Sequence, residues 1–137
     1  MRGSCLCGGV RFEVTEDFLA VTACHCTTCK KISGGAGTVS GRTRPAAIRI
    51  LAGEDLLVNF QPAEGTPKTF CRVCGSNIFG GGWPDAERIS VRLSTLDEPF
   101  DRKEAGDPHL RPLRGGVGDA AGRRRRAPRG QGLTRVC

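Results

Sequence analysis

The sequence predicts a small, mainly β domain with little helix, held together by bound metal. Several runs of residues alternate between apolar and polar side chains, which is typical of half-buried strands, whereas no long window shows helical periodicity. The chain has eight cysteines but only six phenylalanines, one tryptophan and no tyrosine. Because 137 residues with so few aromatics can bury only a modest core, bound metal is a common means of stabilising such a domain.

The first predicted strands lie in the N-terminal half of the chain. "VRFEV" (Val10–Val14) alternates apolar and polar residues. "AAIRILAG" (46–53) and "LLVNF" (Leu56–Phe60) flank an acidic turn at Gly53–Asp55. Two apolar runs on either side of a short turn favour a hairpin, so we expect these two segments to pair.

A further strand is predicted at "RISVRLSTL" (Arg88–Leu96). Its alternation places one set of residues on an apolar face and the other on a polar face: Ile89, Val91 and Leu93 against Arg88, Ser90 and Arg92. The preceding "GGGWPD" (80–85) has the composition of a turn. Helix is limited to about one turn at "TTCKKIS" (27–33).

The cysteines favour a metal site. The N-terminus has no apolar segment of a secretory signal, and no apolar run approaches the ~20 residues of a membrane span. We therefore expect a cytoplasmic chain whose thiols stay reduced. In such a compartment, clustered cysteines indicate metal binding or catalysis rather than disulfides.

Seven of the cysteines form three groups, and Cys137 stands alone in the tail: Cys5 and Cys7; Cys24, Cys26 and Cys29; Cys71 and Cys74. Two cysteines separated by one or two residues can bring both sulfurs onto one metal, and a structural zinc takes four thiolates. Gly75 follows the last pair at the point where a zinc knuckle must turn sharply.

Spacing alone leaves two groupings open. Cys71 and Cys74 can join Cys5 and Cys7, or they can join two cysteines of the middle group. The first grouping leaves three cysteines that are contiguous in sequence, which is geometrically economical. Three thiolates leave the fourth position of a tetrahedral zinc free, and an open position is the mark of a catalytic zinc.

These motifs resemble one known family. "GSCLCGGVRF" (3–12), "CHCTTCKK" (24–31) and "FCRVCGS" (70–76) are similar in order and in flanking glycines to the GFA/CENP-V family, and "SVRLSTLDEPFD" (90–101) resembles its late strand and turn. The family comprises relatives of the glutathione-dependent formaldehyde-activating enzyme, which are grouped as carbon–sulfur lyases. The resemblance covers about residues 2–109.

The resemblance implies an Mss4-like, zinc-bound β-sheet fold, or β-tent, that holds zinc at two places. By analogy with the family, one set of cysteines holds a structural zinc and another a catalytic zinc: Cys5, Cys7, Cys71 and Cys74 for the first, and Cys24, Cys26 and Cys29 for the second. This assignment agrees with the first of the two groupings.

The implied activity is that of a zinc-dependent carbon–sulfur lyase acting on thiol–aldehyde adducts such as S-hydroxymethylglutathione. Glutathione or another small thiol would be the substrate, and zinc would lower the pKa of its thiol. His25 is the nearest titratable candidate for proton transfer, although a histidine between two ligands more often points outward. Lys30 and Lys31 are candidate partners for the carboxylates of glutathione, or simply solvated residues.

The positive charge of the chain is confined to its C-terminal tail. Residues 110–137 contain eight arginines and one aspartate, a balance of +7, which equals the net charge of the whole chain. Residues 1–109 are therefore neutral, and nucleic-acid binding is disfavoured because a binding domain carries a basic face. We expect a zinc domain at 1–109 and a disordered basic Arg/Gly-rich tail at 110–137.

The tail also has the composition of a sequence read out of frame. With permitted codons, reading from the second base of the Leu110 codon gives "YVRSVAAWETLPDDGVAPR". This string alternates like a strand, and it resembles the strand with which the family continues after a histidine such as His109. The sequence thus predicts a frameshift near residue 110, with a genuine disordered tail and an RNA-binding arm as the alternatives.

Two other functions stay open. A non-enzymatic zinc module that binds nucleic acid or protein would use paired cysteines and the arginine tail. Seven clustered cysteines, however, exceed the needs of one four-thiolate site. An inactive family member that keeps only its structural zinc is the other alternative. An accessible, exchangeable zinc would distinguish the enzyme from both.

Overall fold

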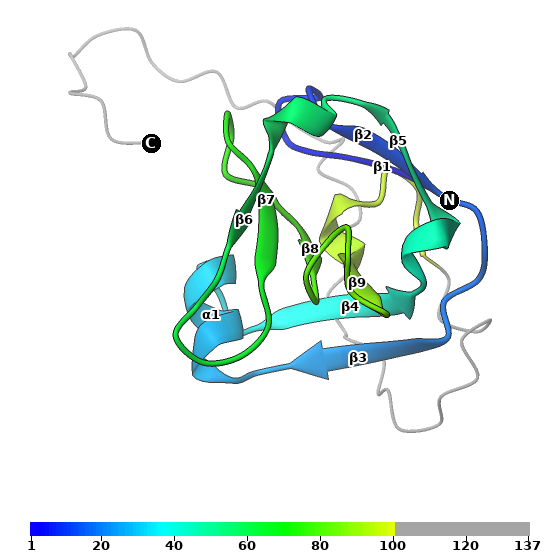
Figure 1. The fold of residues 1–137 in the computed structure, drawn as a ribbon. Coiled ribbons are helices and arrows are strands. Elements are labelled where there is room, and N and C mark those ends of the chain that lie inside the picture. Colours follow the sequence, from blue (N-terminus) through cyan, green and yellow to red (C-terminus); the bar gives the residue numbers. More distant parts are fainter. Residues whose placement is uncertain (101–137) are drawn as a thin grey trace, which may run out of the picture. The chain divides into compact units, whose positions relative to one another are not determined.

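Residues 1–100, which the computed structural model describes, form two antiparallel β-sheets, as the mainly β prediction requires (Figure 1). The three-stranded sheet has the order β1-β2-β5, with β1 (Arg2–Ser4), β2 (Arg11–Val14) and β5 (Ile48–Ala52). The six-stranded sheet has the order β3-β4-β9-β8-β7-β6. Its strands are β3 (Ala20–Cys24), β4 (Thr38–Thr43), β6 (Leu57–Phe60), β7 (Lys68–Cys71), β8 (Asn77–Gly80) and β9 (Ile89–Arg92).

Helix is confined to short segments, as expected. The described residues contain one α-helix, α1 (Thr27–Ser33), and three 3-10 turns, η1 (Pro45–Ala47), η2 (Glu54–Leu56) and η3 (Leu93–Thr95). Helix α1 is seven residues long, somewhat more than the single turn predicted there. It ends at Gly34, whose φ of 63° is the left-handed conformation that favours glycine.

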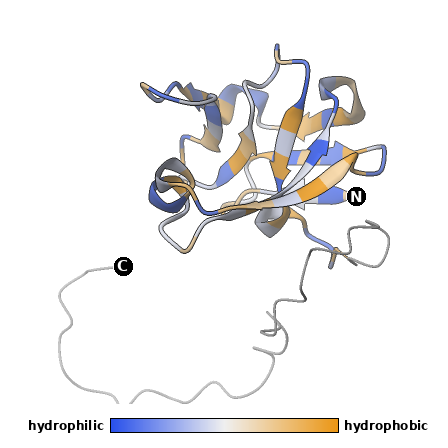
Figure 2. Cartoon of the chain, turned by 90° about the horizontal axis from the view of Figure 1, so that it is seen from below, coloured by the Kyte–Doolittle hydropathy of each residue, from blue (hydrophilic) through white to orange (hydrophobic). Residues whose placement is uncertain are grey.

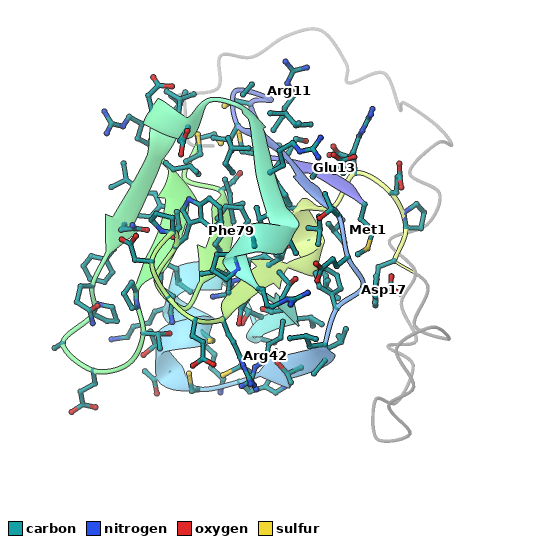
Figure 3. All side chains as sticks on the ribbon, turned by 45° about the vertical axis from the view of Figure 1, so that its right-hand side comes forward. Met1, Arg11, Glu13, Asp17, Arg42 and Phe79 are labelled. Atoms are coloured by element: carbon teal, nitrogen blue, oxygen red, sulfur yellow. The ribbon has the colours of Figure 1, made fainter. Side chains whose placement is uncertain are left out.

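The apolar core lies where the two sheets meet. Phe12 of β2 and Phe79 of β8 are fully buried, and their rings pack edge to face with centroids 5.2 Å apart. Figure 3 shows Phe79 in the interior. Figure 2 shows that the strands carry both hydrophobic and hydrophilic stretches. Trp83 is partly buried against this core, with its ring 5.1 Å from that of Phe79.

The hairpin expected around Gly53–Asp55 is not formed. Strand β5 pairs with β2 in the three-stranded sheet, whereas β6 pairs with β7 in the six-stranded sheet. Gly53 has a φ of 72° and is followed by η2, so the chain turns a corner between the sheets instead of folding back on itself. Both runs are strands, but the turn between them changes sheet.

The late strand alternates as predicted over four residues and then stops. Ile89 and Val91 are fully buried in the core. Arg92 lies on the other face, yet it is only 5% exposed, because that face lines a cavity rather than bulk solvent. Leu93, expected to continue the apolar face, instead begins η3.

The expected domain boundary at 109/110 and the basic tail lie outside the residues that the structure describes. Among residues 1–100, no helix is long and apolar enough to cross a lipid bilayer.

Candidate metal centres

The four cysteines of the outer two groups come together at one place. The sulfurs of Cys5, Cys7, Cys71 and Cys74 all lie within 4.8 Å of one another. Cys5 and Cys7 follow β1, and the other pair forms a turn at the end of β7, where the Gly75 N–H donates to the Cys71 carbonyl. Gly75 has a φ of 73°, so the knuckle uses the conformation that glycine allows.

The three middle cysteines form a second cluster, in which the sulfurs also lie within 4.8 Å of one another. Cys24 ends β3, Cys26 is the N-cap of α1, and Cys29 lies in the helix. The Cys29 N–H donates to the Cys26 sulfur at 3.5 Å. Cys29 is buried, Cys24 is partly exposed and Cys26 is exposed, so this cluster is more open than the first.

The spacing of the sulfurs fits zinc. Cys5 and Cys7 have sulfurs 3.4 Å apart, and Cys7 and Cys71 have sulfurs 3.9 Å apart. These values bracket the ~3.8 Å between two ligands of a tetrahedral zinc with bonds of about 2.3 Å. The sulfurs of Cys24 and Cys26 are also 3.4 Å apart. Both clusters could therefore hold a metal ion, and which ion each holds stays a prediction.

Within the four-cysteine cluster, the thiols do not ionise independently. The Ser76 hydroxyl, 3.3 Å from the Cys74 sulfur, lowers the pKa of Cys74 to about 5. The Gly9 N–H lowers the pKa of Cys7, but the sulfurs of Cys5 and Cys74 outweigh it and raise that pKa to about 11. Ionisation of one thiol thus makes ionisation of its neighbour less favourable. A divalent cation bound to the sulfurs would remove this electrostatic penalty.

Neighbouring sulfurs also shift one another's pKa values in the three-cysteine cluster. The backbone N–H of Cys29 lowers the pKa of Cys26 to about 7, with a further contribution from the Cys24 thiol. The Cys26 N–H lowers the pKa of Cys24, but the neighbouring Cys29 and Cys26 sulfurs outweigh it and raise that pKa. Cys26 therefore ionises before Cys24.

A cavity of about 350 Å³ opens beside the three-cysteine cluster. All three cysteines line it, together with hydroxyl groups from β3, β4 and β9. Three cationic residues also line it, Arg42, Lys68 and Arg92, and the lining contains no aspartate or glutamate. Figure 3 shows Arg42 at the β3–β4 side of the six-stranded sheet. A metal held here would face a positively charged space large enough for a small molecule.

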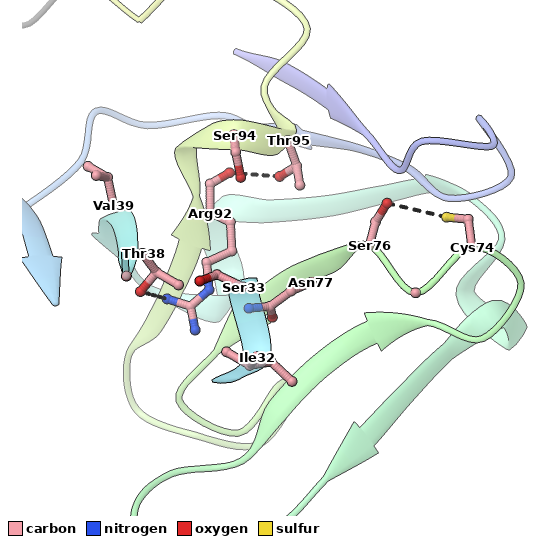
Figure 4. Close-up of a pocket in the computed structure, with 12 residues that line it drawn as sticks. Ile32, Ser33, Thr38, Val39, Cys74, Ser76, Asn77, Arg92, Ser94 and Thr95 are labelled. Atoms are coloured by element: carbon pink, nitrogen blue, oxygen red, sulfur yellow. Dashed lines mark hydrogen bonds between the residues drawn. The ribbon is translucent and has the colours of Figure 1, made fainter. Parts of the chain in front are cut away.

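Arg92 is the most buried of these cations. Its Nη1 donates to Ser40 Oγ at 2.6 Å. It also donates to Thr38 Oγ1 at 3.3 Å, the bond drawn in Figure 4. Burial lowers the pKa of Arg92, whereas charge on Cys29 and Cys24 raises it. Arg92 also borders a larger cavity of about 550 Å³, which includes Cys74 but none of the three middle cysteines.

The other residues singled out in the sequence lie apart from this cavity. His25 is exposed, and its Nδ1 donates to the Ala36 carbonyl at 2.9 Å, so it orients the loop after α1 and does not line the cavity. Lys31 borders a neighbouring cavity of about 300 Å³, which shares Thr28 and Lys68 with the first, and Lys30 is exposed. Sequence reasoning missed the cations that do line the cavity. The polar face predicted for Arg88–Leu96 was the available signal for Arg92.

Comparisons with known proteins agree with the motif resemblance. The family model described as "Glutathione-dependent formaldehyde-activating enzyme" matches residues 1–111. A "Putative glutathione-dependent formaldehyde-activating enzyme" from Halomonas elongata is 29% identical over 113 residues, covering 74% of this chain and 69% of that protein. The crystal structure of a Rhodobacter sphaeroides protein matches with a TM-score of 0.58 and 26% identity, covering 78% of this chain and 96% of that one. The family match spans both cysteine clusters.

Proposed function

Since the chain belongs to the glutathione-dependent formaldehyde-activating enzyme family, we propose that it is a zinc-dependent carbon–sulfur lyase acting on thiol–aldehyde adducts. S-Hydroxymethylglutathione, the adduct of glutathione with formaldehyde, is the substrate that the family name favours. The observation that carries the proposal is the three-cysteine cluster, which lines a cavity of about 350 Å³. A ligand set with room beside it is what a catalytic metal requires.

The two clusters have different roles in this proposal. Cys5, Cys7, Cys71 and Cys74 hold a structural zinc, because four thiolates complete its coordination. The knuckle they form ties the N-terminal segment to β7, and the Leu6 N–H donates to Ser76 Oγ at 3.0 Å across the same junction. Cys24, Cys26 and Cys29 hold the catalytic zinc, which supplies Lewis-acid chemistry and lowers the pKa of a substrate thiol.

The reaction itself is a reversible addition. In the direction of adduct formation, the thiol sulfur forms a bond to the aldehyde carbon and the carbonyl π bond breaks. The thiol proton ends on the new hydroxyl oxygen. Ser40 Oγ accepts the hydrogen bond from Arg92, so its own proton stays available to donate into the cavity. The hydroxyl groups of the cavity are therefore better placed than His25 to pass the proton.

The test is a zinc count followed by an assay of adduct exchange. We expect purified protein to carry two zinc ions, one of which a mild chelator removes. NMR would then follow formation and breakdown of S-hydroxymethylglutathione, and the rate should fall when the exchangeable zinc is removed and recover when it is restored. One tightly held zinc without turnover would contradict the proposal and favour an inactive relative or a binding module.

A further inference from the structure

The cavity beside Cys24, Cys26 and Cys29 has an unbalanced charge. Arg42, Lys68 and Arg92 line it, and no carboxylate does. The ion pairs among the described residues are Arg44–Glu16 and Arg49–Glu13, so none of the three cavity cations has an acidic partner in this part of the chain.

Two of these cations are buried. Lys68 is 7% exposed and Arg92 is 5% exposed, whereas buried lysine and arginine are normally paired with an anion. Lys68 Nζ donates to Thr66 Oγ1 at 3.0 Å, and Arg92 Nη1 donates to two hydroxyls. The Arg92 Nε is buried without a hydrogen-bond partner among the described residues. Hydroxyl groups satisfy some of the donors, but they do not neutralise the charge.

The sheet register brings both buried cations to one face. Arg92 of β9 lies opposite Ser40 of β4, and Lys68 of β7 lies opposite Gly80 of β8. A side chain at Gly80 would place its Cβ 2.7 Å from Arg92 Nη2. Gly80 therefore leaves room for the guanidinium of Arg92. Arg92 is thus accommodated inside the fold and does not lie on its surface.

The cysteine cluster supplies only part of the missing negative charge. Charge on Cys29 and Cys24 stabilises the charged form of Arg92. Once three thiolates bind Zn²⁺, however, their net charge is −1, against three cations that line the cavity. Among residues 1–100 no other group that lines the cavity supplies the remaining negative charge, which an anion entering with the substrate would provide.

We propose that Lys68 and Arg92, assisted by Arg42, form a carboxylate-binding subsite that selects thiols bearing a carboxylate. This inference rests on the proposed function, because it assigns a specificity to the same cavity. Charge-assisted hydrogen bonds from lysine and arginine are the usual means of recognising a carboxylate, and arginine can bind both of its oxygens. A neutral thiol would leave the two buried cations unpaired and should bind more weakly.

The first test changes the ligand and leaves the protein intact. S-Methylglutathione keeps both carboxylates of glutathione but has no thiol, so its binding reports on the subsite independently of turnover. Isothermal titration calorimetry on the zinc-loaded full chain should give a Kd at least roughly tenfold lower for S-methylglutathione than for its dimethyl ester. Equal affinities for the acid and the ester would overturn the proposal.

The second test changes the protein. Lys68→Gln and Arg92→Gln should each weaken binding of S-methylglutathione by roughly tenfold or more while leaving the ester unaffected. Arg92→Lys keeps the charge and should retain part of the affinity. Lys30→Gln is the matched control, because Lys30 is exposed and does not line the cavity. Circular dichroism and the zinc count show whether each variant is folded.

Three results separate this inference from the proposed function and from a merely structural role. Carboxylate-dependent binding without adduct turnover would keep the subsite and reject the lyase. Turnover with equal KM for the glutathione and 2-mercaptoethanol adducts would keep the lyase and reject the subsite. Loss of the exchangeable zinc in Arg92→Gln, with equal binding of acid and ester by the wild type, would show that Arg92 only neutralises the thiolates.

Discussion

At the residue scale, Cys26 combines two roles that constrain each other. Its sulfur caps helix α1 by accepting the Cys29 N–H, and it is also one of the three predicted zinc ligands. A capping position usually carries an oxygen acceptor, and sulfur is a weaker one. A thiolate accepts better than a thiol, so ionisation of Cys26 strengthens the start of the helix that holds Cys29. Ligand formation and helix capping therefore favour the same charge state.

The ionisation of this cluster is testable by alkylation. The pKa of Cys26 is lowered to about 7 and that of Cys24 is raised, so the thiolate fraction at Cys26 grows as the pH rises through about 7, while Cys24 still holds its proton. After mild chelation, iodoacetamide should modify Cys26 before Cys24 at neutral pH, with a half-maximal rate near pH 7, as followed by mass spectrometry. Zinc-loaded protein is the control and should be protected. Earlier modification of Cys24 would contradict the assignment.

Substitution of one cysteine in each cluster should have different consequences. Cys71→Ser removes a fully buried sulfur from the cluster that joins the N-terminal segment to β7, so we expect loss of zinc and of the folded state. Cys29→Ser should leave the fold largely intact, remove the exchangeable zinc and reduce turnover by roughly a hundredfold or more. Zinc counts, circular dichroism and the adduct assay measure these effects. Identical behaviour of the two variants would argue against separate structural and catalytic roles.

The candidate site was only partly predictable from sequence. Spacing groups the seven cysteines and leaves two arrangements, and the structure has one of them, with Cys71 and Cys74 beside Cys5 and Cys7. Lys68 was not predictable as a cavity residue, because it lies in a strand far along the chain from the middle cysteines and meets them only through the order of the sheet. The nearby Lys30 had the more obvious position in sequence and lies outside the cavity.

At the scale of elements, the sequence predicted four of the nine described strands from their apolar alternation and missed the other five. Strands β2, β5, β6 and β9 coincide with predicted runs. Strand β4, "TVSGRT", has no apolar alternation, because Ser40 and Arg42 line the cavity and Thr38 accepts a hydrogen bond from Arg92. That β5 and β6 pair with strands of different sheets could not be predicted either, because β5 pairs with β2, which is distant in sequence, and β6 pairs with β7.

The corner between β5 and β6 gives the element-scale prediction. Gly53 has a φ of 72°, and a Cβ there would clash with the Gly9 carbonyl oxygen. Gly53→Ala should therefore lower the free energy of unfolding by about 1–3 kcal/mol, measured by urea denaturation of the zinc-loaded protein. Gly35→Ala is the control, because its added Cβ would meet the Ser33 hydroxyl only at an ordinary 3.8 Å. Equal stability of the two variants would show that the corner adapts.

At the scale of the whole molecule, residues 1–109 have no net charge, but their basic and acidic residues lie in different places. Residues 1–109 contain thirteen basic and thirteen acidic residues. The acidic partners Glu13 and Glu16 form ion pairs that are largely exposed, whereas Lys68 and Arg92 are buried beside the cysteines. Net charge alone argued against a basic surface for nucleic acid, and it gave no sign of the positive cavity. The distribution of charge, not its sum, indicates an anionic ligand.

The chain beyond residue 109 gives the last prediction. Strand β3 pairs only with β4 among the described residues, so one of its edges is open in this part of the chain, and the family match ends at residue 111. If the tail is out of frame, a protein with "YVRSVAAWETLPDDGVAPR" after His109 gains a strand. Four or five cross-strand pairs should raise its free energy of unfolding by about 1–4 kcal/mol.

Urea denaturation of three proteins tests this prediction: the chain as written, the chain ending at His109, and the chain with the shifted-frame segment after His109. We expect the first two to unfold at the same urea concentration, because the sequence of residues 110–137 has no apolar alternation with which to pack. The third should unfold at a higher concentration. A loss of stability when residues 110–137 are removed would show that the written tail is a genuine part of the domain. No gain from the shifted-frame segment would remove the structural reason for a frameshift.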